Sequence, residues 1–162
     1  MIRQANESDI KAIEDIFLDA IQWMRQNHIE NQWNEENTKW GQLSKEYAIT
    51  DFYLAEENGV VAACLAITDE DQKYWSDIPK GQALYLHKLA VKRDYAGHGL
   101  STELMNYIKE VAKARGIESV RLDCNYQRRK LRAIYERAGF VYAGKTELVN
   151  HCEMALYAWV RE

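Results

Sequence analysis

The chain has 162 residues, of which 47% are hydrophobic and 28% charged, so it is long enough to bury a core of its own. This balance is typical of a globular protein and excludes a disordered or low-complexity chain. The formal net charge of −4 argues against a general nucleic-acid binder, and no apolar run is long enough to span a membrane. We therefore expect neither a nucleic acid nor a membrane as partner.

A first strand and a long first helix are predicted from the local sequence. Residues 2–5 form a strand-like run, and Asn6 or Ser8 can cap the helix that follows. The helix has one apolar stripe, with residues three and four positions apart. Its members are Ile10, Ile13, Phe17, Ile21 and Met24. The segment also lacks the apolar core of a signal peptide, so a cytoplasmic location is the default expectation.

The next part of the chain predicts a loop, a second helix and a hairpin. Residues 27–34 are polar and predict a loop. A second helix is expected to begin at Asn34-Glu35-Glu36, with acidic residues in its first turn, and to carry Trp40, Leu43 and Tyr47. Residues 52–55 and 60–67 are strand-like runs joined through Asn58-Gly59, which is a strong hairpin signal.

The second half alternates strands and helices. Residues 69–80 are charged and predict an excursion loop or a short helix. Strands are predicted at 83–91, 119–124, 140–148 and 152–160, and helices at 100–114 and 127–138, closed by Gly116 and Gly139. A strand, a crossover helix and a second strand imply a parallel pair, whereas the terminal hairpins imply antiparallel pairing. The sequence therefore predicts one α/β domain, 1–162, with a mixed, mostly antiparallel sheet and helices on both faces.

The three cysteines, Cys64, Cys124 and Cys152, are an odd number at wide spacing. They fit neither a disulfide framework nor a zinc site. We therefore expect small buried thiols, and no metal.

Glycines mark the link at residues 96–102, where a predicted strand hands over to a helix. A Rossmann loop requires G-x-G-x-x-G, but Thr102 occupies the last glycine position, and no Gly-Lys-Ser/Thr of a P-loop is present. Two interpretations stay open at this point. The link is either an anion site made by main-chain N–H groups at a helix start, or an ordinary strand–helix turn.

Two motifs in the correct order resemble the GNAT family of N-acetyltransferases. The family loop Arg/Gln-x-x-Gly-x-Gly/Ala is matched in part, by Gly99 with Ala96 and Ser101 at the other two positions. The second motif, Tyr-Glu-x-x-Gly-Phe, is present from Tyr135 to Phe140. The resemblance covers residues 84–140 firmly and the first strand, capped helix and hairpin more loosely.

The resemblance implies acetyl-CoA as a co-substrate, with the strand beside its pantetheine arm and the link around its pyrophosphate. Arg128 stands where the family commonly has an asparagine that faces the cofactor. The implied cofactor-binding residues are Leu89, Ala90, Val91, Gly97, His98, Gly99, Leu100, Ser101, Thr102 and Arg128. Ordinary core packing is the alternative for the strand residues, and a solvated helix face is the alternative for the basic helix that follows Arg128.

The resemblance also implies roles in catalysis. Tyr135 is the candidate general acid for the departing thiolate, with a buried helix tyrosine as the alternative. His87 is the candidate base for the acceptor amine, with a hydrogen-bonded core histidine as the alternative. Tyr85, on the same strand face as His87, and Trp33, in a polar loop, are the candidate substrate contacts.

We therefore expect an acetyl-CoA-dependent N-acetyltransferase in which an amine attacks the thioester directly, without a cysteine acyl-enzyme. The acceptor is a small-molecule or peptide amine that the sequence does not identify. The alternative is an acyl-CoA-binding regulatory module with little turnover. A homodimer through the final strands is compatible with the sequence.

Overall fold

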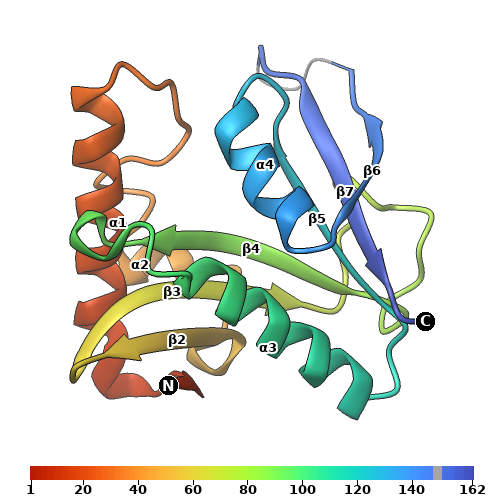
Figure 1. The fold of residues 1–162 in the computed structure, drawn as a ribbon, viewed down its shortest axis with the longest axis horizontal. Coiled ribbons are helices and arrows are strands. Elements are labelled where there is room, and N and C mark those ends of the chain that lie inside the picture. The colour runs from red at the N-terminus through yellow and green to blue at the C-terminus, as the bar shows by residue number, and fades with distance from the viewer. Residues whose placement is uncertain (148–150) are drawn as a thin grey trace. The chain divides into compact units, whose positions relative to one another are not determined.

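The structure is a computed structural model that describes residues 1–147 and 151–162 (Figure 1). The strands are β1 (Ile2–Gln4), β2 (Phe52–Glu57), β3 (Val60–Thr68), β4 (Leu84–Val91), β5 (Ser119–Asn125), β6 (Val141–Lys145) and β7 (Met154–Val160). The α-helices are α1 (Ile10–Gln26), α2 (Trp40–Leu43), α3 (Leu100–Ala114) and α4 (Arg129–Arg137). No helix within the described part of the chain is long and apolar enough to cross a bilayer.

The described strands form one seven-stranded sheet in the order β1-β2-β3-β4-β5-β7-β6. The pairs β1–β2, β2–β3, β5–β7 and β6–β7 are antiparallel, and β4–β5 is parallel. The predicted mixed, mostly antiparallel sheet is therefore confirmed. The contacts between residues divide the chain into two compact units, and each unit is described by itself. Unit 1 comprises Met1–Ala66 and Lys88–Leu104, and unit 2 comprises Ile67–His87 and Met105–Glu162.

Unit 1 is built around the apolar stripe of α1. The helix entry has a capping box, because the Asn6 side chain accepts from the Ser8 N–H while the Asp9 side chain accepts from the Asn6 N–H. The stripe packs against one face of β2 and β3. This core includes Ile13, Ile16, Phe17, Phe52, Leu54, Cys64 and Ala66, all of which are fully buried.

Unit 2 holds α4 against β7. Tyr135 of α4 packs edge-on against Phe140, with ring centroids 6.3 Å apart, and beside Tyr157 of β7 at 6.2 Å. The buried Lys109 of α3 donates a hydrogen bond to the Ala138 carbonyl where α4 ends, and its burial lowers its pKa. Lys109 of α3 thus anchors the C-terminus of α4.

Most predicted elements are confirmed, but the second helix is much shorter than expected. The Asn34 side chain accepts hydrogen bonds from the N–H groups of Glu36 and Asn37, at 2.9 and 2.8 Å. This is the bonding of a helix N-cap, but the turn is not continued, because the backbone is extended at Lys39 with ψ 148°, and α2 begins only at Trp40. Residues 69–80 form turns, in agreement with the loop alternative. The predicted strand end at position 148 lies outside the described residues.

We expect Asp9→Asn to lower the free energy of unfolding by about 2 kcal/mol, because Arg3 loses two charge-assisted hydrogen bonds. The Arg3 guanidinium donates to both oxygens of the buried Asp9 carboxylate at 2.8 Å. These bonds hold the pKa of Asp9 below its usual value. Their contribution is therefore present above the unfolded-state pKa and is lost as the pH falls through the folded-state pKa.

Urea unfolding at neutral and at acidic pH tests this ion pair. The stability difference between wild type and Asp9→Asn is expected to shrink in acid, and a difference that does not change with pH would contradict the prediction. Asp15→Asn is the control, since it removes only an exposed ion pair with Lys11 and should barely change stability.

Candidate functional site

The glycine link of unit 1 presents a group of unused main-chain donors. Gly97 and Gly99 have φ angles of +82° and +81°, a conformation that glycine adopts without strain. The first bond of α3 is donated by Glu103 to the Gly99 carbonyl, at 3.0 Å. No described residue accepts a hydrogen bond from the N–H groups at five positions of the link and first turn. These positions are Gly97, Gly99, Leu100, Ser101 and Thr102.

These donors have the chemistry of an anion site. They lie at the N-terminus of a helix of 15 residues, where the helix dipole adds partial positive charge. A Cβ built on either Gly97 or Gly99 meets nothing within 4 Å, so a ligand can approach the backbone closely there. The link therefore fits the pyrophosphate that the sequence predicts for it.

His98 is held at the edge of this link. Its Nδ1 lies 2.6 Å from Glu57 Oε2, at the end of β2, and its ring meets the Tyr95 ring edge-on at 5.7 Å. The imidazole is thus positioned by a carboxylate as well as by the loop, and its role as a phosphate neighbour stays a prediction.

β4 contains a backbone irregularity at Lys88, whose φ is +58°. A non-glycine residue in this conformation is uncommon within a strand and is typical of a bulge. The alternation that places Tyr85 and His87 on one face of β4 is interrupted at Lys88. It therefore does not predict which face the Leu89 side chain occupies. Ala90 is buried in the core of unit 1, whereas Leu89 and Val91 are half-buried.

Trp33 is half-buried at the surface of the unit 1 core. It meets Phe17 edge-on at 5.1 Å, and the Lys88 ammonium lies 5.7 Å from its ring centroid. The ring also lines a small hollow together with Ile21 and Met24 of α1. Trp33 therefore combines core packing with a partly open face, and its substrate role stays a prediction.

Tyr135, the candidate acid, is a buried residue of unit 2. Burial raises its pKa strongly, the negative charge of Asp123 adds to this, and the positive charge of Arg128 opposes it. The phenol therefore keeps its proton at neutral pH, as a general acid must. Its hydroxyl makes no hydrogen bond to a described residue.

Arg128 is the N-cap residue of α4 and is half-buried. Its burial lowers its pKa, which the neighbouring Tyr135 and Cys124 partly offset. A guanidinium keeps its charge under these conditions. Arg128 therefore supplies positive charge near Tyr135, whereas Arg132 of the same helix is bound to the Tyr157 hydroxyl at 2.9 Å.

His87 and Tyr85 differ in their exposure, although they share a face of β4. Tyr85 is fully buried, and its hydroxyl has no hydrogen-bond partner among the described residues. His87 is half-buried, and its Nε2 lies 2.9 Å from Thr68 Oγ1. The parallel pairing with β5 joins Leu84 to Val120 and Tyr85 to Arg121. The candidate base His87 is therefore partly exposed to solvent, whereas the Tyr85 side chain is enclosed in the core.

The environments of two of the three cysteines argue against a thiol nucleophile, whereas Cys152 is half-buried, so the expectation of buried thiols is wrong for Cys152. Cys64 and Cys124 are both buried, and burial raises the pKa of both thiols, that of Cys124 to about 12. A protonated thiol is a poor nucleophile. The two buried thiols are therefore inert at neutral pH.

Two acidic residues near His87 were missed by the sequence analysis. Asp71, in the turns before β4, and Asp123, on β5, each bring a carboxylate oxygen close to a ring nitrogen of His87. These three ligand atoms lie within 4.8 Å of one another, and all three residues are half-buried. The parallel register beside Tyr85 could have indicated Asp123, but nothing in the sequence placed Asp71 there.

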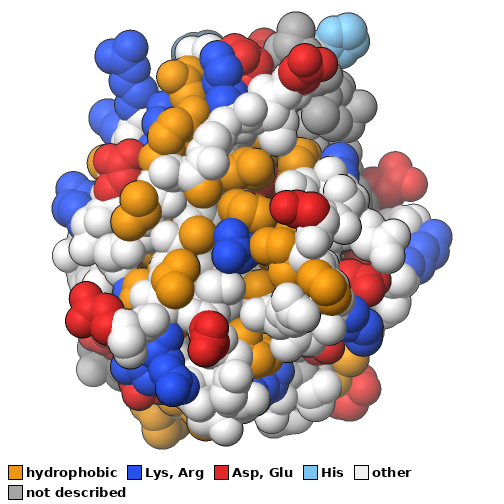
Figure 2. Space-filling model, turned by 90° about the vertical axis from the view of Figure 1, so that its right-hand side faces the viewer, with side chains coloured by type: hydrophobic (Ala, Val, Ile, Leu, Met, Phe, Trp, Pro, Cys, Tyr) orange, Lys and Arg blue, Asp and Glu red, His pale blue; other side chains and the backbone are white. Residues whose placement is uncertain are grey.

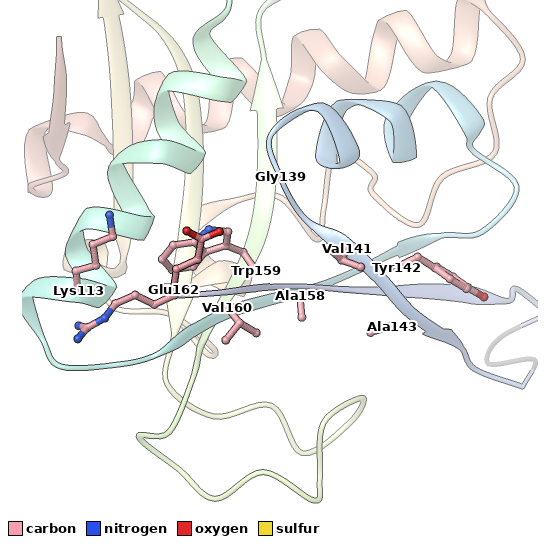
Figure 3. A pocket seen from close by; sticks show the side chains of 10 residues that line it. Lys113, Gly139, Val141, Tyr142, Ala143, Ala158, Trp159, Val160 and Glu162 are labelled. Atoms are coloured by element: carbon pink, nitrogen blue, oxygen red, sulfur yellow. The ribbon is translucent and has the colours of Figure 1, made fainter.

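A hollow in unit 2 is lined by none of the predicted site residues. It is lined by β6, β7, Lys113 and the C-terminal residues (Figure 3). Hydrophobic side chains gather on the face shown in Figure 2, among Lys, Arg, Asp and Glu. Val141, Tyr142 and Val160 are exposed on these last strands. Nothing in the described chain indicates what covers them, so the homodimer stays a prediction.

Comparison with known proteins identifies the family to which the chain belongs. The family model described as the acetyltransferase (GNAT) family matches residues 11–140. The chain belongs to the GNAT family. The resemblance predicted from the two motifs is therefore confirmed, and with it the acetyltransferase class of the protein.

Individual relatives agree with this assignment to the GNAT family. An uncharacterised N-acetyltransferase of Bacillus subtilis, YesJ, is 27% identical over 143 residues, which cover 84% of this chain and 78% of YesJ. A GNAT-family acetyltransferase structure from Listeria monocytogenes has a TM-score of 0.76 at 22% identity, over 99% of this chain and 94% of that one. The ribosomal-protein-S18-alanine N-acetyltransferase of Escherichia coli has a TM-score of 0.71 at 17% identity, over 99% and 92%. These two structures show the shared GNAT fold.

Proposed function

We propose that this GNAT protein transfers the acetyl group of acetyl-CoA to an amine by direct attack of the amine on the thioester. The observation that carries the proposal is the set of five unused N–H groups at the start of α3. A pyrophosphate needs several such donors, and a helix N-terminus supplies them together with a favourable dipole. Acetyl-CoA, when bound, supplies the activated acetyl group.

The main chain of β4 is assigned to the pantetheine arm. Residues 89–91 follow Lys88, whose φ is positive, and an extended ligand can pair with strand N–H and C=O groups as an added strand. Because side chains alternate while main-chain groups stay available, the burial of Ala90 is compatible with this role.

Proton transfers are assigned to two residues of unit 2. His87 accepts the proton of the acceptor amine, and Tyr135 donates a proton to the departing thiolate. Any phenol is protonated at neutral pH, and the burial that raises the pKa of Tyr135 makes the transfer itself harder. The charge of Arg128 stabilises the phenolate that forms, which reduces the cost of the donation.

No acyl-enzyme is part of the proposed reaction. The buried thiols of Cys64 and Cys124 are protonated at neutral pH, and neither has a histidine within the described hydrogen bonds. A variant with all three cysteines replaced by alanine or serine is expected to retain turnover. Loss of turnover with an intact fold would overturn direct attack.

The proposed function is tested by CoA release from acetyl-CoA with a panel of primary amines. We expect release with at least one amine, together with a rise in melting temperature when acetyl-CoA is added; a ligand at about a hundred times its Kd stabilises by about 2.7 kcal/mol. Stabilisation without release from any amine would instead favour the regulatory module. A cytoplasmic location stays a prediction of the sequence.

A further inference from the structure

The pair of His98 and Glu57 in unit 1 places an ionisable ring beside the proposed phosphate donors. His98 Nδ1 lies 2.6 Å from Glu57 Oε2, and the His98 side chain is 45% exposed, so a ligand can reach it. Within the link at residues 96–102, His98 is the only residue with an ionisable side chain. The unused N–H groups are dipoles without net charge, so only His98 can give this link a full positive charge.

The chain that leads into the link is fixed by two other elements of unit 1. The Lys92 N–H donates to the Ala62 carbonyl of β3 at 2.8 Å. The Arg93 N–H donates to Asp19 Oδ2 of α1 at 2.7 Å. Since β2 holds the His98 ring itself, the imidazole has a defined position beside the N–H donors.

Two ionisable side chains contact the imidazole of His98 in the described part of the chain. Glu57 reaches it from the end of β2, and Tyr95 of the 3₁₀ turn η3 (Arg93–Tyr95) meets it edge-on at 5.7 Å. Among the described residues, no lysine or arginine forms an ion pair with Glu57. Arg3 binds two other carboxylates, and Arg93 stacks on a tryptophan ring at 3.7 Å. His98 is therefore the one group placed to neutralise Glu57.

The contact with Glu57 determines which nitrogen of His98 carries a hydrogen. A carboxylate can only accept a hydrogen bond, so Nδ1 must be the donor in this pair. In the neutral ring, Nε2 then holds a lone pair, which repels a phosphate oxygen. In the imidazolium, Nε2 also carries a hydrogen and can donate it. No described residue occupies Nε2, so only the protonated ring can bind a phosphate there.

We propose that His98 binds the pyrophosphate of acetyl-CoA only as an imidazolium, so that cofactor binding takes up a proton from the solvent. The proposal rests on the proposed acetyltransferase function and concerns the regulation of its cofactor site by pH. The proton goes onto His98 Nε2, and the resulting N–H donates a hydrogen bond to a pyrophosphate oxygen. Glu57 is a positioning residue, because its contact with Nδ1 fixes the ring and leaves Nε2 for the ligand.

The charges at this pair favour the protonated ring once an anion is bound. The carboxylate of Glu57, if it were not neutralised, would repel a pyrophosphate, since both are negative. With the imidazolium present, the pair has no net charge, and the phosphate meets an N–H donor in place of a lone pair. The proton therefore removes one repulsion and adds one charge-assisted contact.

Calorimetry of acetyl-CoA binding in two buffers of different ionisation enthalpy measures the proton uptake. At about pH 7.5 we expect roughly half a proton or more per acetyl-CoA, because imidazole titrates near neutral pH. Between about pH 6 and about pH 9 the Kd should rise about ten- to a hundredfold, which corresponds to the loss of one charge-assisted contact. Dephospho-CoA keeps the pyrophosphate and lacks the 3′-phosphate with its own titration, and it should show the same dependence.

Two substitutions of His98 test whether the ring is the group that takes up the proton. His98→Asn should abolish the uptake and weaken binding about tenfold or more at about pH 6, where the wild type binds most tightly. His98→Lys should bind tightly across this range without proton uptake, because an ammonium keeps its charge up to about pH 10.

His28→Asn is the matched control, since His28 is another exposed histidine of unit 1. Asparagine tolerates the φ of +55° at this position, so the variant should fold normally. It should leave both the proton uptake and the pH dependence of the Kd unchanged.

Glu57→Ala tests the positioning role. It should weaken acetyl-CoA binding about threefold or more in the wild-type background and cause no loss in the His98→Asn background, because Glu57 acts only through the ring. An equal loss in both backgrounds would overturn this role.

The outcomes separate this proposal from the proposed function. Acetyl-CoA binding without proton uptake, or with an uptake that His98→Asn leaves unchanged, would overturn the role of His98 even if amines are acetylated. A pH dependence that is lost with dephospho-CoA would overturn the contact with the pyrophosphate. Proton-linked binding that requires His98, without CoA release from any amine, would support the role of His98 and overturn the acetyltransferase function.

Discussion

Tyr135→Phe is expected to lower kcat about a hundredfold while the Kd of acetyl-CoA stays within about threefold. The substitution removes only the hydroxyl proton that we assign to the departing thiolate. Thiols have a reference pKa of about 8.5, so a thiolate can leave without help, which is why the expected loss lies at the lower end for a general acid. Stopped-assay CoA release and calorimetry with acetyl-CoA provide the two measurements.

The neighbouring Tyr157 provides a matched control for this substitution. Its hydroxyl donates to Glu136 Oε1 at 2.6 Å and accepts from Arg132 Nε at 2.9 Å. Tyr157→Phe should therefore cost about 1–2 kcal/mol of stability with little effect on kcat. Tyr135→Phe should show the opposite, because its hydroxyl has no described hydrogen bond to lose. Equal kcat for wild type and Tyr135→Phe would remove Tyr135 from the mechanism.

Local sequence signals were sufficient for most elements of the fold. The helix predicted at 100–114 is observed as α3 with the same bounds, because its apolar spacing and Gly116 act within the helix itself. The Asn58-Gly59 hairpin is confirmed with both residues at positive φ, as its turn type requires. The prediction of the second helix was wrong because the turn that Asn34 caps ends at Lys39, where the backbone is extended, a change that apolar spacing does not report.

The candidate site was predictable only where its chemistry lies in a continuous segment. The donors at the start of α3 follow from the glycines and the helix that comes after them, so residues 97–102 could be named in advance. The irregular backbone at Lys88 could not be named in advance, because nothing in its side chain favours a φ of +58°. Asp71 could not be placed either, since its position beside His87 depends on how the turns of residues 69–80 pack in unit 2.

Gly99→Ala is expected to weaken acetyl-CoA binding by about ten- to a hundredfold, the equivalent of roughly 1.5–3 kcal/mol for a lost hydrogen bond to a charged group. The new methyl group occupies the open space beside the N–H donors, where the pyrophosphate is proposed to approach. Alanine at a φ of +81° also strains the link by about 1–2 kcal/mol.

Gly116→Ala separates these two effects, because Gly116 closes the other end of α3. Its φ is +69°, and a Cβ there also meets nothing within 4 Å, so the strain is similar at both positions. Both variants should lose about 1–2 kcal/mol of stability, while only Gly99→Ala should raise the Kd and KM for acetyl-CoA. If the two variants bind acetyl-CoA equally well, the helix start is not the pyrophosphate site, since the only difference between them is which end of α3 carries the methyl group.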